Sequence, residues 1–287
     1  MRAFETRDIG LLRRALNADR VSAAYLLGDL DEPFFGQCRW WVAEDERAPV
    51  AVLMVFGGLA TPALLTFGRP DGVAGAFREA APWLPEACYL KVAEADEPIV
   101  GARYRILDRR PSSVMALDRD AFRMPSRPGE VRRLAPDRVD EVLQVYRSYP
   151  RNFFEPSQLA TGIYFGSFED DRLVAVAGTH VFSPRERIGV PGNIVTVTDA
   201  RGKGHARACT AAVVETLYDR GCDTIVLHVA ESNAAAIAAY RALGFTTRGR
   251  IVQARGIGSE HRTQNTEHRI QNAEHGTRKT ECGSDQR

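Results

Sequence analysis

The stretch from Asn193 to Phe245 decides the fold, and it reads NIVTVTDARGKGHARACTAAVVETLYDRGCDTIVLHVAESNAAAIAAYRALGF. It opens with an apolar, β-branched run, Ile194 to Thr198, which predicts a strand, and it then turns through Asp199 to Gly204. Small or apolar residues at the spacing of one helical face predict a helix after the turn: Ala206, Cys209, Val213 and Leu217. A strand, a glycine turn and a helix in this order make an anion site.

The turn carries the residues that a phosphate group needs. The first turn of a helix leaves backbone N–H groups without partners, and the aligned peptide dipoles add roughly half a positive charge there. Gly202 and Gly204 let the backbone approach a pyrophosphate closely, while Arg201 and Lys203 supply cations. Taken alone, the turn is explained equally well as an ordinary connection between a strand and a helix.

The second part of the stretch adds an independent pattern. Thr224 to Val229 reads as a buried strand, and Ser232-Asn233 begins a helix that Gly244 ends. On that helix Ala236 and Tyr240 share one face. The two patterns together are more specific than either one.

Together they resemble the GCN5-related N-acetyltransferase (GNAT) family and, within it, the FR47-like branch. The family's cofactor motif, Gln/Arg-x-x-Gly-x-Gly/Ala, is matched by Arg201, Gly204 and Ala206. The motif that follows it, Asn-x-x-Ala-x-x-x-Tyr-x-x-x-Gly-Phe, is matched by Asn233, Ala236, Tyr240, Gly244 and Phe245.

The resemblance implies that acetyl-CoA (coenzyme A) is the cofactor and that the strand, the turn and the second helix bind it. The residues expected to do so are Ile194, Val195, Thr196, Val197, Arg201, Gly202, Lys203, Gly204, His205, Ala206, Asn233, Ala236 and Tyr240.

Composition excludes several classes of partner. A chain of 287 residues predicts about two domains, and 44% hydrophobic with 26% charged residues is typical of a globular protein. The net charge of +1 gives no field that would gather nucleic acid or an anionic membrane, so neither is expected. The N-terminus is charged throughout, no apolar stretch is long enough to cross a bilayer, and the five cysteines lack metal-ligand or redox spacing. We expect a cytoplasmic protein without a metal site, and the sequence leaves a homodimer open.

The first hundred or so residues predict the same order of elements as a GNAT domain. Helices are expected over 9–16, 20–30, 72–81 and near 98–104, and strands over 36–44, 50–56, 63–67, 87–92 and 114–117. The phosphate turn is not repeated, because Phe67 to Gly72 stands in its place. There Pro70 removes an amide donor and Asp71 adds a repelling charge. We expect a degenerate, GNAT-like half that does not bind the acyl donor and acts as a scaffold or shapes the acceptor site.

The fold class expected is α/β (α+β), a tandem GNAT fold in which each half is a mixed, mostly antiparallel twisted sheet flanked by helices. The expected parts are a degenerate domain over 1–122, a linker over 123–129, a catalytic domain over 130–254 and a disordered, dispensable tail over 255–287. In the tail, three polar seven-residue units begin at His261, His268 and His275, and they lack the apolar positions of a coiled coil.

Acyl transfer to an amine needs a base, a donor to the thioester oxygen and an acid for the departing thiolate. A backbone N–H on the strand Ile194 to Val197 is the expected oxygen donor. Tyr240 suits the acid, because a tyrosine with a pKa near ~10 keeps its proton at pH 7. Glu155, in the segment that borders the acceptor pocket in the family, and His180 are both candidates for the base.

The sequence therefore predicts an N-acetyltransferase that moves an acetyl or short acyl group from acetyl-CoA to a small-molecule or peptide amine. Two alternatives remain open at this point. One is a coenzyme A binding or sensing module without catalysis, and the other is a structural interaction protein in which both halves are degenerate. Tandem proteins with a silent first half include mycothiol synthases and glycine N-acyltransferase-like proteins, and the sequence selects neither substrate.

Overall fold

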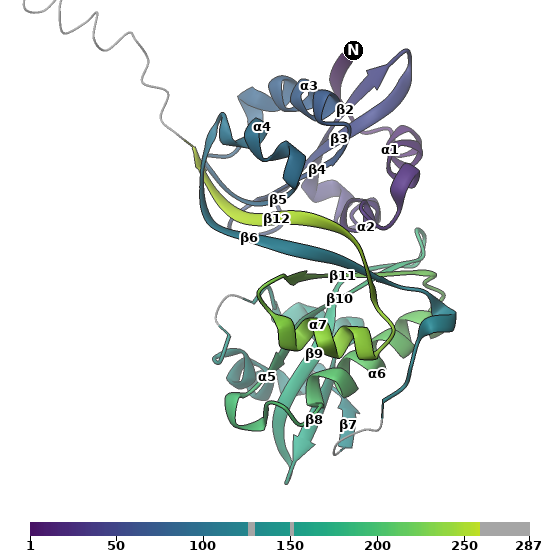
Figure 1. Cartoon of the computed structure of the whole chain (residues 1–287), viewed down its shortest axis with the longest axis vertical. Helices are drawn as coiled ribbons and strands as arrows, with labels where there is room; N and C mark the ends of the chain where they lie inside the picture. Colours follow the sequence, from purple (N-terminus) through teal and green to yellow (C-terminus); the bar gives the residue numbers. More distant parts are fainter. Residues whose placement is uncertain (126–129, 150–151, 259–287) are drawn as a thin grey trace, which may run out of the picture.

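The computed structural model describes residues 1–125, 130–149 and 152–258 (Figure 1). Within these residues the strands form one mixed, mostly antiparallel sheet of twelve. The first half contributes β1 (Arg2–Thr6), β2 (Cys38–Asp45), β3 (Ala48–Phe56), β4 (Ala63–Gly68), β5 (Ala87–Ala93) and β6 (Tyr104–Leu117). The second half contributes β7 (Glu130–Arg133), β8 (Phe165–Glu169), β9 (Arg172–Ser183), β10 (Ile188–Thr196), β11 (Thr224–Ala230) and β12 (Thr246–Gly258).

Helices flank this sheet in both halves. They are α1 (Ile9–Leu16), α2 (Ala24–Gly28), α3 (Pro70–Ala80), α4 (Glu97–Gly101), α5 (Val139–Tyr146), α6 (His205–Asp219) and α7 (Ala234–Ala242). Two 3-10 helices matter for the site, η7 (Pro156–Thr161) and η8 (Thr198–Ala200). This is the tandem arrangement that the order of predicted elements indicates, and the strands predicted over 36–44 and 50–56 are confirmed as the antiparallel pair β2 and β3.

The two halves exchange strands at the middle of the sheet. The strand order is β1-β2-β3-β4-β5-β12-β6-β11-β10-β9-β8-β7, so β12 of the second half lies between β5 and β6 of the first, and β6 pairs with β11 (Figure 1). Among the strand pairs of the described residues, two are parallel, β4 with β5 and β10 with β11. Each half therefore completes the sheet of the other.

The sequence did not predict β1 or β12, and the limit set for the tail was wrong. Residues 255–258 are not a disordered tail, because β12 continues to Gly258 and Arg255 pairs with Tyr89 on one side and Leu107 on the other. The buried positions near this end are small: a Cβ on Gly256 would lie 3.1 Å from the Tyr104 ring. Main-chain pairing on both edges holds the strand where its side chains give almost no hydrophobic pattern. Residues 259–287 and linker residues 126–129 lie outside the described part of the chain.

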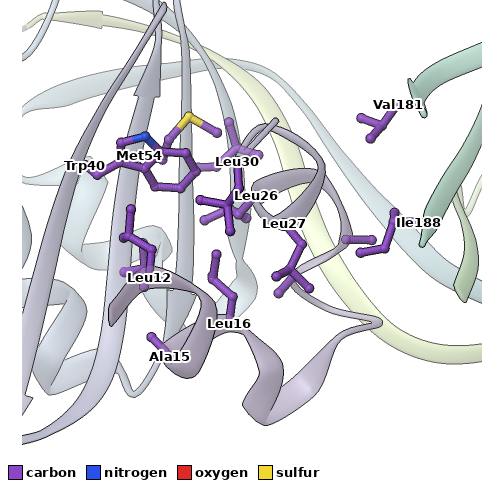
Figure 2. Packing of buried hydrophobic residues seen from close by; sticks show 14 of the residues in the cluster. Leu12, Ala15, Leu16, Leu26, Leu27, Leu30, Trp40, Met54, Val181 and Ile188 are labelled. Atoms are coloured by element: carbon purple, nitrogen blue, oxygen red, sulfur yellow. The ribbon is translucent and has the colours of Figure 1, made fainter. Parts of the chain in front are cut away.

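One hydrophobic core joins the halves (Figure 2). Helix α1 begins where the Asp8 carboxylate accepts the Leu11 amide at 3.0 Å, and its apolar face packs beside that of α2. The leucines of these two helices lie between Trp40 and Met54 of the first-half sheet and Val181 and Ile188 of the second (Figure 2).

The approach of α2 to the second half is close. A Cβ on Gly28, the last residue of α2, would lie only 2.0 Å from Val181 Cγ1 on β9, so this position accepts glycine alone without a shift of the helix. Within the described residues, the cysteines Cys38, Cys88, Cys209 and Cys222 are free and buried. In that same part of the chain, no helix combines the length and the apolar character that crossing a membrane requires.

Candidate functional site

The site is built around the divergence of β10 and β11. These strands pair only at Ile188 with Thr224 and at Gly189 with Ile225. Beyond that point β10 remains paired with β9, and β11 with β6. The two parallel strands therefore separate in the middle of the sheet, and their facing edges are left without sheet partners.

A bulge on β10 lies beside this opening. The register with β9 shifts between Gly192 and Val195, so Asn193 and Ile194 stand opposite the single residue Ala177, without partners of their own in the pairing. Asn193 has a left-handed φ of 52°. The bulge therefore sets the direction of the backbone where the predicted strand Ile194 to Thr198 begins.

The pairing beyond the bulge narrows the set of amides that can serve as oxygen donors. Val197 N–H donates to Val174 O at 2.9 Å, so it is already used. Antiparallel pairing directs alternate amides to opposite sides of a strand, and the amide of Thr196 therefore points toward the opening. Within the predicted run Ile194 to Val197, the Val197 amide is therefore excluded, the Thr196 amide lies on the side away from β9, and Ile194 lies in the bulge itself.

Each diverging strand also carries a buried polar atom without a partner. Thr196 Oγ1 on β10 and His228 Nδ1 on β11 find no hydrogen bond among the described residues. A buried polar atom left unsatisfied costs about 1–3 kcal/mol. Each of the two strands that border the opening thus carries a buried polar atom for which the described residues supply no partner.

The predicted phosphate turn has the geometry of an anion cradle. Gly202 and Gly204 adopt left-handed φ angles of 81° and 90°. Gly204 is the N-cap of α6 and provides no side-chain cap, and the first turn of α6 contains no acidic residue. A Cβ on Gly202 would meet nothing within 4 Å, so there is open space beside the turn. The residues present therefore fit the pyrophosphate of coenzyme A.

The side chains around the cradle are already partly engaged. Arg201 Nε donates to Thr196 O at 3.2 Å, and Lys203 Nζ lies 3.0 Å from Glu169 Oε1. His205 is 2% exposed and bridges Ser167 Oγ and Glu169 Oε1, both at 2.9 Å, so only its backbone is available to a ligand. Glu169, the last residue of β8, thus ties the β8–β9 hairpin to the start of α6.

The second motif forms α7 as predicted. Asn233 caps the helix, since its Oδ1 accepts the Ala236 amide at 3.2 Å, and Ala236 packs partly buried against the same core as Tyr240. Tyr240 is 8% exposed and lies 6.0 Å from the Phe245 ring. Burial raises the pKa of Tyr240 above its ordinary value of 10.0, so its hydroxyl keeps a proton at neutral pH.

The two candidate bases lie in different settings. Glu155 is the N-cap of η7, where its carboxylate accepts the Gln158 amide in a capping box, and its side chain is exposed. His180 is held on both ring nitrogens: Nε2 lies 3.0 Å from Asn193 Oδ1, and Nδ1 lies 2.9 Å from the hydroxyl of Tyr25. Burial, with a smaller effect of the Lys91 charge, lowers the pKa of His180 to about 4.

Residues of the first half that the sequence did not single out lie beside His180. Lys91 Nζ is 3.3 Å from the centroid of the Tyr25 ring, and the His228 ring is 4.8 Å from that ring. Burial raises the pKa of Asp29 to about 7 and lowers that of Lys91 to about 7. The one signal in the sequence was Lys91, a cation inside the otherwise apolar strand ACYLKVA.

Comparison with known proteins agrees with this geometry. Residues 131–245 match the Acetyltransferase (GNAT) family. The chain is 33% identical over 104 residues to a mycothiol acetyltransferase of Tsukamurella paurometabola, a match that covers 35% of this chain and 36% of that protein. The chain thus spans about a third of the length of the curated relatives it matches.

Two solved structures share the fold over nearly the whole chain. A GCN5-related N-acetyltransferase from Sphaerobacter thermophilus has a TM-score of 0.58 at 19% identity and covers 90% of this chain and 96% of its own. A tandem GNAT protein from the clavulanic acid biosynthesis pathway has a TM-score of 0.55 at 16% identity and covers 90% and 99%. At these identities the likeness concerns the fold alone.

Proposed function

We propose, from the match of residues 131–245 to the Acetyltransferase (GNAT) family, that this acyltransferase moves an acetyl or short acyl group from acetyl-CoA to an amine. One observation carries the proposal: the opening between β10 and β11 adjoins an α6 N-terminus that has neither a side-chain cap nor an acid. Backbone donors and a positive helix end there suit an anionic cofactor with a carbonyl at one end.

In this proposal acetyl-CoA supplies the thioester carbonyl, and the chain's own groups do the rest. The amides of Gly202 to Ala206 hold the pyrophosphate. The amides of Ile194 and Thr196 face the acyl oxygen and stabilise the charge it gains as the amine adds. The N–C bond forms and the C–S bond breaks, the nitrogen loses one proton to the base, and Tyr240 gives its proton to the thiolate and is then reprotonated.

The attacking amine must be neutral. A lysine-like amine with a pKa of ~10.4 is almost fully protonated at pH 7, and an α-amine with a pKa of ~8 is about nine-tenths protonated. Glu155 is an exposed carboxylate with room to accept a proton, whereas the ring nitrogens of His180 already have partners. Glu155 and His180 both stay predicted bases, and the geometry favours Glu155.

The test is release of free thiol from acetyl-CoA over a panel of amines, including the acceptor of mycothiol acetyltransferases, with the full chain. Transfer to at least one amine supports the proposal. Tight binding of coenzyme A without transfer to any amine would instead favour a binding or sensing module. Absence of binding by calorimetry would favour a structural interaction protein.

A further inference from the structure

We infer that Tyr25, on α2 of the first half, is a positioning residue for the reactive strand of the second half. Its hydroxyl fixes the ring of His180, and that ring fixes the side chain of Asn193 in the bulge of β10. The inference rests on the proposed function, because it concerns the amides that adjoin Asn193 and face the acyl oxygen. It gives the half without a phosphate turn a part in the reaction.

Asn193 is the residue whose conformation decides where β10 points its amides. Its φ of 52° is left-handed, a region that few residues other than glycine adopt and in which asparagine is enriched. Every polar group of its side chain, and its backbone carbonyl, is engaged. The Tyr146 hydroxyl donates to Asn193 O at 2.6 Å, and Asn193 Nδ2 donates to Tyr164 Oη at 2.9 Å and to Gln158 Oε1 at 3.1 Å.

The remaining bonds of Asn193 assign the protons of His180. The Phe153 amide can only donate, and it lies 3.2 Å from Asn193 Oδ1, so this atom is the amide oxygen and accepts. His180 Nε2 shares the same oxygen at 3.0 Å and must therefore carry a hydrogen. Because His180 is neutral, its Nδ1 has a lone pair, and the Tyr25 hydroxyl donates to it. Both hydrogen bonds therefore have the same direction: the Tyr25 hydroxyl donates to His180 Nδ1, and the His180 Nε2–H donates to Asn193 Oδ1.

The surroundings favour this neutral tautomer. Gly192 has no Cβ where one would lie 2.5 Å from the His180 ring, so the ring can rest on the backbone of β10. The titratable groups near it are Tyr25 from α2, Lys91 from β5 and His228 from β11, and Asp29, the residue after α2, acts on Tyr25 and Lys91. The charge of Lys91 adds to burial in lowering the pKa of His180. A base with its lone pair occupied and its pKa lowered serves better as a hydrogen-bond relay than as a proton acceptor.

The chain of bonds crosses the junction between the halves. Tyr25 lies on the helix whose end is in contact with β9 through Gly28, and His180 and Asn193 lie on β9 and β10. Docking of α2 therefore sets the orientation of the His180 ring, and through it the bulge beside Ile194. Loss of the Tyr25 hydroxyl should loosen the acyl-oxygen donors and leave the distant pyrophosphate cradle as it is.

The test is Tyr25→Phe, which keeps the ring that Lys91 and His228 contact and removes only the hydroxyl. We expect turnover to fall about tenfold while acetyl-CoA affinity stays within about twofold, as for a group that acts on orientation in the reaction. Tyr104→Phe is the matched control. It also removes a buried first-half hydroxyl, one that donates to Pro85 O at 2.8 Å, and it should leave turnover unchanged. Equal turnover of Tyr25→Phe and the control would overturn the inference.

A second measurement needs no cofactor. In ¹⁵N-histidine spectra of the ligand-free chain, wild-type His180 should hold a single neutral Nε2–H tautomer to below pH 5, given its pKa of about 4. In Tyr25→Phe the Nδ1 lone pair is freed, so the pKa of His180 should rise and its Nδ1 signal should move. An unmoved Nδ1 signal would refute the hydrogen bond itself. If no amine is acylated by the wild-type chain, the proposed function fails and this spectrum still tests the positioning.

Replacement of His180 separates a relay from a base. His180→Gln offers a donor to Asn193 and an acceptor to Tyr25, whereas His180→Leu offers neither. A positioning role predicts that the glutamine variant has clearly more turnover than the leucine variant, by about threefold or more. Equal, complete loss in both variants would assign His180 to proton transfer and contradict the relay.

Discussion

The two halves repeat one strand–turn–helix unit with opposite chemistry. In the first half β4 pairs with β5 in parallel at three positions, Ala63 to Leu65, and leads through Gly68, at a φ of 103°, into α3. In the second half β10 pairs briefly with β11 and leads through a glycine turn into α6. Helix α3 starts with Pro70, which has no amide hydrogen, and carries Asp71 in its first turn, where it pairs with Arg69. Helix α6 has no side-chain cap at its N-terminus and no acidic residue in its first turn.

The openings between the parallel strands differ as well. In the first half Thr66 Oγ1 donates to Asp96 Oδ2 at 2.6 Å, and both side chains are buried. In the second half Thr196 Oγ1 has no partner among the described residues. Both halves thus have two parallel strands followed by a helix, while among the described residues of these two units only the second has a helix start without proline or acid, as the proposed cofactor site requires. Fold and ligand chemistry are set by different residues.

The largest effect is expected from separating the halves. Residues 1–122 alone lack β12, so β5 and β6 would both present unpaired edges, and the shared core would lose its Val181 and Ile188 contacts. We expect this fragment not to fold cooperatively, as judged by circular dichroism and thermal melting. A sharp melting transition of the fragment at the temperature of the whole chain would show that the exchanged strands contribute nothing to stability.

The next largest effect tests the chemistry assigned to the second half. Tyr240→Phe keeps the ring that packs on Phe245 and removes the proton, so turnover should fall about 10²-fold with similar acetyl-CoA affinity. The measurement is steady-state thiol release beside calorimetry. Weaker binding with unchanged turnover at saturation, or no effect at all, would remove Tyr240 from the catalytic residues.

Much of this comparison could be predicted from the sequence, because the motif residues have local roles. Gly204 and Asn233 each act within one turn of the chain, as a left-handed cap and as a side-chain cap, and local spacing reveals such roles. The strand exchange could not be predicted, since Gly256 and Ala254 give β12 little hydrophobic signal and its partners are about 150 residues away. The contact of Tyr25 with His180 was hidden for the same reason: it depends on how two halves dock.

A smaller effect is expected from changes in the glycine turn before α6, compared with changes at the turn before α3 in the first half. Gly204→Val should weaken acetyl-CoA binding about tenfold or more, through strain at φ 90° and a side chain at the amides. Gly221→Val is the control, because Gly221 has a similar φ of 88° at the other end of α6. Titration should give one site per chain, and Arg69→Ala should leave the affinity alone. A stoichiometry of two, or equal affinities of the two valine variants, would contradict the assignment of the cofactor to the second half.

The smallest effect concerns Asp96, the buried acid of the first half that accepts the hydrogen bond of Thr66 on β4. Burial raises the pKa of Asp96 above its ordinary value of 3.8, so the folded chain binds its proton more tightly than the unfolded chain. The stabilisation is complete below the ordinary pKa and is lost as the pH rises through the raised one. Asp96→Asn cannot ionise, so its melting temperature relative to wild type should rise between pH 4 and pH 8, by about 2 °C or more.

Asp71→Asn is the control of opposite sign. The bond to Arg69 lowers the pKa of Asp71, so its stabilisation is present above the ordinary pKa and is lost as the pH falls through the lowered one. Relative to wild type, Asp71→Asn should therefore look less stable at pH 7 than at pH 3, and only slightly, because this pair is exposed. If the difference in melting temperature between Asp96→Asn and wild type stayed constant across the pH range, the ionisation of Asp96 would not oppose folding. The exclusion of an anionic cofactor from that half would then rest on Pro70 and Asp71 alone.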